Sequence, residues 1–445
     1  MKRKLARIVL LVALLVASGT CANAQEPAPQ RLTLKDAIRL ALKNNLGVRV
    51  SSTQVDEAEG TRKRRFSALL PHVSGDSMAS LQNRNLSAAG ISAPGFPTVV
   101  GPFAYYDFRL FAQQEIVDRQ AYHTWKAGEK QEQAARLDYQ DTRDLVIRQA
   151  AGLYLDAEFG SAEVEAAESR VVTSQTLEKL AIDQHDQGLA TAVDVVRAQV
   201  QLARDRQNAL VARNNYQTAL LSLARFLGLS PGTPLELAEH LQFHTVEVPD
   251  VNRTVQTALE ARSDYRALLI QREALAEERK ASHARYLPKL SINGDYGALG
   301  RNLGNMPGIG EIQGTLSVTL FDQDRKGEEK EIESRLERLN AQIDDQARGI
   351  EQDMRKAVLD LQSTADQVTV TEAALALAQR ELELAQDRFR NGVTDNIEVV
   401  TAQSALASAQ DDRIGALARH ADARVALARA LGDTEKIYEA YLGEP

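Results

Sequence analysis

The second half of the chain repeats the first half at a fixed offset of 204 residues. Without any gap, residues 181–228 match residues 385–432 at 16 of 48 positions. The register also holds where a helix must reverse, because Gly188 falls on Gly392. Similarity between alanine-rich helices would not keep glycines and helix ends aligned. We therefore interpret the repeat as an internal duplication of one structural unit.

Each half is predicted to contain a helix, two strands and two long helices. The long helices are expected at about 122–184, 191–227, 326–390 and 395–431. In the first of them, small and apolar residues recur in alternating steps of four and three, the spacing of a coiled-coil seam. These residues are Ala150, Leu153, Ala157, Gly160, Val164, Ala167 and Val171. A helix from 122 to 184 would be about 90 Å long at 1.5 Å per residue, too long for a compact globular domain.

The strands are indicated by strict alternation of apolar and polar residues. This alternation runs through 290–298 and 311–320, which flank a Gly/Asn/Pro-rich loop. The first half has the same plan with a noisier pattern, and its strands are expected near 73–82 and 103–116. Alternation with a period of two is typical of a strand with two different faces.

Aromatic residues are concentrated around the second of these strands. Eight of the 22 aromatic residues fall within residues 96–125. They are Phe96, Phe103, Tyr105, Tyr106, Phe108, Phe111, Tyr122 and Trp125. We interpret this window as a girdle at a membrane interface, with an ordinary soluble core as the alternative.

Residues 1–24 have the features of a cleaved secretory signal peptide: a basic start, an apolar stretch, and Ala22-Asn23-Ala24 before Gln25. Acylation of Cys21 in a lipoprotein is the alternative. After cleavage the chain has no cysteine, which excludes disulfides and thiolate chemistry. We divide the remainder into a first repeat (25–228), a linker (229–252), a second repeat (253–432) and a C-terminal tail (433–445).

The charge argues against one class of function, and the apolar pattern argues against helical membrane spans. Cleavage of the signal changes the formal net charge from −8 to −12, which argues against nucleic-acid binding. No second apolar run approaches the length of a membrane helix, so any membrane span must be β. Because a closed membrane barrel needs about eight strands and this chain offers four, each protomer is expected to contribute part of a shared barrel.

The chain resembles the outer-membrane efflux protein family, the TolC family, over essentially its whole mature length. The resemblance rests on the order of several short elements at a constant offset. They are 32–45 (LTLKDAIRLALKNN), Leu287-Pro288-x-Leu290, Phe321-Asp322, 187–195 (QGLATAVDV) and 391–399 (NGVTDNIEV). The resemblance implies a mainly helical fold: a homotrimer with long coiled-coil helices in a periplasmic α-barrel and a shared 12-stranded β-barrel in the outer membrane.

The two helix reversals are the first candidate functional positions. Gly188 and Gly392 would supply the positive φ of a helix C-cap, which is a sufficient structural role. The family resemblance implies in addition that these reversals are periplasmic tips. There a periplasmic adaptor (membrane fusion) protein, itself joined to an inner-membrane pump, would dock on Gly188, Leu189, Gly392 and Val393.

Asp194 and Glu398 lie six residues after the two glycines, in the first turn of the returning helix. There they complement the helix dipole, or in a trimer they form rings of three carboxylates at a periplasmic constriction. Thr401 stands where the family often carries a further acidic residue, and Thr394 stands where a basic partner can occur. At both positions the chain departs from the family's gate network.

No enzymatic site is indicated, and no cofactor is expected. Only His240 and His244 have a helical metal-ligand spacing, but they lie in a proline-bounded linker, which favours a solvated or packing role. The sequence therefore predicts an exit duct of a tripartite efflux or type I secretion system. A periplasmic coiled-coil adaptor is the main alternative, and a soluble enzyme is a distant third.

Overall fold

The computed structural model describes residues 30–435, apart from 92–93, 96, 247, 392, 395 and 433. The expected signal peptide with Cys21 lies outside the described residues, as does most of the expected tail. The described residues form two compact units. The first unit comprises residues 30–43, 149–244 and 366–422, and the second comprises residues 44–148, 245–365 and 423–435.

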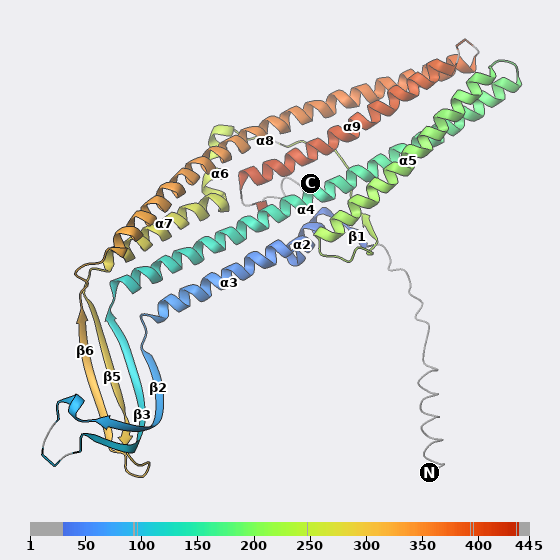
Figure 1. The fold of residues 1–445 in the computed structure, drawn as a ribbon. Coiled ribbons are helices and arrows are strands. Elements are labelled where there is room, and N and C mark those ends of the chain that lie inside the picture. Colours follow the sequence, from blue (N-terminus) through green and yellow to red (C-terminus); the bar gives the residue numbers. More distant parts are fainter. Residues whose placement is uncertain are drawn as a thin grey trace, which may run out of the picture. The chain divides into compact units, whose positions relative to one another are not determined.

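The second unit contains one antiparallel sheet in the order β2-β3-β5-β6 (Figure 1). Its strands are β2 (His72–Asn85), β3 (Val99–Val117), β5 (Lys289–Gly300) and β6 (Gly308–Ser317). The central pair β3 and β5 joins the two halves of the sequence, with Tyr106 opposite Gly300. Two strand pairs were predicted, and the structure confirms both of them. Within the described residues, β2 and β6 each pair with a single strand, so each leaves one edge unpaired.

The four longest helices of the described part form two antiparallel pairs, and each pair ends in a reversal of the chain (Figure 1). They are α4 (Arg119–Asp186), α5 (Ala192–Phe226), α8 (Asp324–Arg390) and α9 (Asn396–Leu431). Their ends agree with the sequence prediction to within a few residues. Among the helices of the described part, none has both the length and the apolar character needed to cross a membrane.

The helix expected before each strand pair is in fact two helices. They are α2 (Leu34–Asn44) with α3 (Leu46–Ser67), and α6 (Val251–Ala261) with α7 (Ser263–Ala284). Asn45 interrupts the first with an extended backbone (ψ 135°) and accepts a hydrogen bond from Gly47 N through its side chain. Arg262 interrupts the second at ψ 122°. Both breaks restart a helix at an N-cap, which a pattern of apolar periodicity does not reveal.

A segment that we call the strap, residues 235–244, crosses the helices of the first unit. It begins with β4 (Leu235–Leu237), which pairs in parallel with β1 (Gln30–Leu32). Beyond β4, Leu241 packs against a buried cluster from α8 and α9. At the far end, the ring of Phe243 lies 4.9 Å from the ring of His420 on α9. The strap is thus attached to the helices at several points along its length.

Candidate functional site

The first helix reversal, between α4 and α5, is closed by main-chain hydrogen bonds around Gly188. Leu189 N donates to Gln184 O at 2.8 Å, and Gly188 N donates to His185 O at 2.9 Å. Gly188 has φ +75°, a left-handed conformation that glycine adopts without steric cost. No atom lies within 4 Å of the position that a Cβ would occupy. The constraint at this position is therefore conformational, because space for a side chain is available.

The helix after this reversal, α5, begins with a capping box formed by Thr191 and Asp194. The Asp194 carboxylate accepts hydrogen bonds from Thr191 N at 2.9 Å and from Thr191 Oγ1 at 2.6 Å. Asp194 is only 5% exposed. Burial raises the pKa of Asp194, but the hydrogen bonds from Thr191 and the charge of Arg197 outweigh burial and hold the pKa below its ordinary value. Asp194 therefore stabilises the start of α5 as a carboxylate.

The second reversal, between α8 and α9, is arranged differently. Gly392 and Asp395 lie outside the described residues, and α9 begins at Asn396. The Glu398 carboxylate accepts hydrogen bonds from Thr394 Oγ1 at 2.6 Å and from Arg388 at 2.9 Å. The Glu398 side chain is 37% exposed, unlike the enclosed carboxylate of Asp194. The two equivalent acidic residues therefore differ in their access to solvent.

Two buried amide side chains connect the two reversals, which lie side by side in Figure 1. Gln184 Nε2 on α4 donates to Phe389 O on α8 at 3.0 Å. Asn396 Nδ2 on α9 donates to Asp194 O on α5 at 2.9 Å. An apolar cluster of α4, α8 and α9 residues lies behind them. It comprises Leu177, Leu382, Ala385, Phe389, Val399 and Ala402. The tips of the two hairpins are thus joined by both polar and apolar contacts.

Apolar side chains at the tips remain exposed. Leu189 is 61% exposed and Val393 is 67% exposed. Val193, Val196 and Ile397, which follow on α5 and α9, are also about half exposed or more. Thr401 lies one turn after Ile397, is exposed, and donates its hydroxyl to Ile397 O at 2.8 Å. The predicted docking residues that the structure describes are therefore accessible in the single chain.

The sequence analysis missed the residues that join the two reversals. It singled out neither Gln184 nor Asn396, and it did not identify Arg388 as the partner of Glu398. Asn396 aligns with Ala192 in the duplication and Gln184 aligns with Arg388, so the repeat gave no signal at these positions. Within the residues that the structure describes, no group of three or more His, Cys, Asp or Glu side chains is arranged to hold a metal ion.

The sequence profile of the outer membrane efflux protein family matches residues 37–229 and 254–433. The chain belongs to this family. It is 24% identical to the toluene efflux pump outer membrane protein TtgC of Pseudomonas putida, over 92% of this chain and 83% of TtgC. It is 21% identical to the alkaline protease secretion protein AprF of Pseudomonas aeruginosa, over 86% of this chain and 80% of AprF.

The fold of this outer membrane efflux protein is also that of solved outer-membrane channels. The CmeC channel of Campylobacter jejuni superimposes with a TM-score of 0.80 at 17% identity, over 93% of this chain and 90% of CmeC. The chain is thus an outer membrane efflux protein with the fold of an outer-membrane channel, and its family consists of channels, not enzymes. One of the two relatives named above serves efflux and the other serves secretion.

Proposed function

We propose that the chain is one protomer of a homotrimeric exit duct, which receives solutes at its periplasmic end from an adaptor and an inner-membrane pump. The observation that carries this proposal is the pair of helical hairpins whose tips are joined to each other and carry exposed apolar side chains. Leu189 and Val393 lie at these tips, 61% and 67% exposed. Exposed apolar side chains at the end of long helices suit docking of a helical partner.

The sheet supports assembly with other copies of the chain. In lipid, unpaired N–H and C=O groups at a sheet edge cost several kcal/mol each, so open edges are not tolerated. The free edges of β2 and β6 would both be paired if three copies joined their four strands in a closed ring of twelve. In this proposal the barrel lies in the outer membrane in contact with lipid, and the helices extend into the periplasm.

The alternative functions fit the observations less well. A periplasmic adaptor carries one helical hairpin flanked by compact β domains, whereas here a strand pair precedes a long helical hairpin in both halves of the chain. An enzyme would need converging nucleophilic, acid–base or metal-binding groups in a cleft. The joined tips offer capping and amide contacts instead, so we propose a passive duct without catalysis or cofactor.

Fractionation and single-channel recording together test the proposal. We expect the mature chain in outer-membrane fractions as a heat-resistant oligomer, with a native mass of about three protomers. We also expect discrete conductance steps after reconstitution in planar bilayers. A freely soluble periplasmic monomer without channel activity would overturn the duct and favour the adaptor. Capture of an adaptor by site-specific crosslinking from Leu189 would support docking at the tips. Failure to capture an adaptor from this position would contradict docking there.

A further inference from the structure

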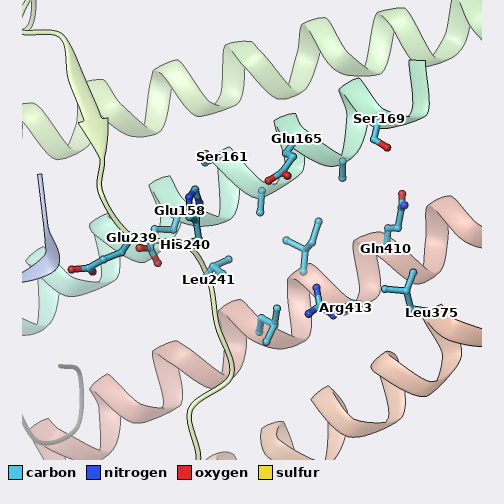
Figure 2. A pocket seen from close by; sticks show the side chains of 14 residues that line it. Glu158, Ser161, Glu165, Ser169, Glu239, His240, Leu241, Leu375, Gln410 and Arg413 are labelled. Carbon is cyan, nitrogen blue, oxygen red and sulfur yellow. The ribbon is translucent and has the colours of Figure 1, made fainter. Parts of the chain in front are cut away.

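A cavity of about 510 Å³ lies under the strap in the first unit (Figure 2). Its walls are formed by α4, by α8 and α9, and by strap residues 239–241. This volume is within the range of sites that hold small organic ligands. The cavity is separate from the hairpin tips described above, since none of the tip residues lines it.

The charge of the cavity is predominantly negative. Glu158 and Glu165 on α4 bring two carboxyl groups to its wall, and Glu158 is only 5% exposed. Glu239 on the strap also lines the cavity, but its carboxylate accepts hydrogen bonds from Leu34 N at 3.3 and 3.4 Å. Figure 2 shows the Glu165 side chain extending from α4 into the space between α4 and α9. The guanidinium of Arg413 also lines the cavity, but it lies 3.5 Å from the carboxylate of Glu372 on α8. The balance of charge therefore favours a cationic ligand.

The opposite wall of the cavity is apolar. Leu241 of the strap, Leu375 of α8, and Ile414 and Leu417 of α9 contribute aliphatic side chains. Ile414 and Leu417 are 8% and 3% exposed and belong to the packed interior of this unit. A strongly hydrated metal ion or a small ammonium ion would leave this wall without a partner. A ligand that complements both walls needs an apolar body together with its positive charge.

Gln410 on α9 gives an independent indication of a ligand. Its Oε1 atom is buried, yet it accepts no hydrogen bond from any residue that the structure describes. Figure 2 shows the Gln410 side chain extending from α9 towards α4 across the cavity. Most buried polar atoms in proteins have a hydrogen-bond partner, and an N–H donor from a ligand would supply one here.

We propose that this cavity binds an amphipathic organic cation that carries N–H donors. The positive charge lies near Glu165 and Glu158, an N–H group donates to Gln410 Oε1, and the apolar body contacts Leu375 and Leu417. Because the strap forms one wall, the bound cation also holds the strap against the helices. Binding does not require solute flow, so this proposal stands apart from the exit-duct proposal.

The test uses the purified full-length protein and two fluorescent dyes that share one ring system. Rhodamine 6G is a cation with N–H groups, and its free-acid form, rhodamine 19, has no net charge near neutral pH. We expect fluorescence anisotropy to report saturable binding of rhodamine 6G and clearly weaker binding of rhodamine 19. Higher salt should weaken the binding of rhodamine 6G. Equal affinity for the two dyes, or no saturable binding of either, would overturn the proposal.

Two variants locate the site. Glu165→Gln removes one negative charge from the cavity and should weaken binding of rhodamine 6G about fivefold, the size of one charge interaction near a wet surface. Gln410→Met keeps the side-chain volume, removes the acceptor, and should weaken binding about threefold to tenfold. Glu178→Gln is the control, because Glu178 also lies on α4 but does not line the cavity. An equal loss in the Glu178 variant, or unchanged affinity in both cavity variants, would refute the assignment.

Discussion

Asn396 Nδ2 donates a hydrogen bond of 2.9 Å to the main-chain oxygen of Asp194, a residue 202 positions earlier in the chain. The Asn396 side chain is almost fully buried, at 2% exposed. The bond joins the first turn of α9 to the first turn of α5. Separation of the two tips would leave two polar groups without this partner, so Asn396 is placed to hold them together.

Replacement of Asn396 by alanine should therefore loosen the tips. We expect Asn396→Ala to favour local opening by about 1–3 kcal/mol, the cost of a buried polar group that loses its partner. The double variant with Gln184→Ala should loosen the tips further, because both inter-hairpin amides are then lost. Hydrogen exchange of the amides in residues 184–200 should become faster, and single-channel conductance should rise.

Ser404→Ala is the matched control for these variants. Ser404 is an exposed polar residue on α9 whose hydroxyl donates to Val400 O within the same helix. It should leave both exchange and conductance unchanged. Unchanged hydrogen exchange at the tips in the double variant Asn396→Ala/Gln184→Ala would show that the apolar cluster alone holds the hairpins together.

The two tip glycines offer a second test, which separates conformation from docking. Joint replacement of Gly188 and Gly392 by leucine should preserve the yield of trimer but abolish efflux. Leucine has room at Gly188, where no atom lies within 4 Å of a Cβ position, but it disfavours φ +75° and adds bulk at the proposed docking point. Efflux is measured as the export rate of a dye in intact cells.

Asparagine at the same two positions is the comparison. Asparagine enters the left-handed conformation more readily than leucine and is less bulky, so the asparagine pair should retain more efflux. A different outcome is that the double leucine variant lowers the yield of folded trimer while the trimer that does form still docks its partner. That outcome would show that the two glycines serve the fold alone.

Acid stability provides a third test, centred on Asp264 in the second unit. Its carboxylate accepts hydrogen bonds from Arg262 at 2.6 Å and from Gln346 at 2.8 Å. Burial raises the pKa of Asp264, but the hydrogen bond and charge of Arg262, helped by Arg429, outweigh burial and hold the pKa below its ordinary value. Because the folded pKa is lowered, this contribution to stability is complete above the unfolded pKa of about 3.9 and is lost as the pH falls through the folded pKa.

Asp264→Asn should cost about 3–5 kcal/mol near neutral pH, because Arg262 is 5% exposed and would lose its main counter-charge. Between neutral pH and about pH 3, the stability of this variant should fall less steeply than that of the wild type, and the difference should arise below about pH 4. Thermal unfolding of the purified oligomer across this range measures both effects. Asp344→Asn, an exposed residue on α8, is the control and should change neither. An Asp264 variant with wild-type stability and acid sensitivity would exclude this role.

The sequence was sufficient to predict the long elements, because their signals are periodic and occur twice. The seam through Ala150, Ala157 and Ala167 predicted α4, and the alternation at 290–298 predicted β5. A helix break depends on a few local dihedral angles instead. Nothing in the periodic pattern marks Arg262 as extended, and its conformation accompanies ion pairs of the buried Arg262 guanidinium with Asp264 and with the exposed Asp353, 91 residues away.

The tips were predicted only in part, for a related physical reason. Gly188 has a local signature, because a positive φ at a helix end selects glycine whatever surrounds it. Gln184 and Asn396 act through main-chain oxygens of distant residues, and a main-chain acceptor leaves no trace in the identity of the residue that carries it. The position of Asp194 was recognised from its place in the helix, whereas its burial depends on the neighbouring helices.

The last prediction concerns charge at the proposed constriction, where Asp194 and Glu398 occupy equivalent places behind the two tips. If three copies of Glu398 face a narrow passage, Glu398→Gln should lower cation selectivity in planar bilayers. Arg388→Gln should raise it, because Arg388 donates to Glu398 at 2.9 Å and offsets its charge. Asp194→Asn should act in the same direction as Glu398→Gln but more weakly, since Asp194 is 5% exposed and engaged by Thr191. Each charge interaction is worth about 1 kcal/mol at 4 Å in water and several times more where solvent is excluded.

Salt distinguishes a ring of carboxylates from ordinary charges at the start of a helix. At 1 M salt the Debye length is about 3 Å, so the differences between wild type and the variants should nearly disappear. The measurement is the reversal potential across a salt gradient, recorded from correctly assembled trimers at low and at high mean salt. Opposite shifts for Glu398→Gln and Arg388→Gln at low salt, with no shift at high salt, would support the ring. Wild-type selectivity in the double variant Asp194→Asn/Glu398→Gln at low salt would exclude the ring of carboxylates. Both residues would then act only in capping and in complementing the helix dipole, which stabilise a helix without acting on permeating ions.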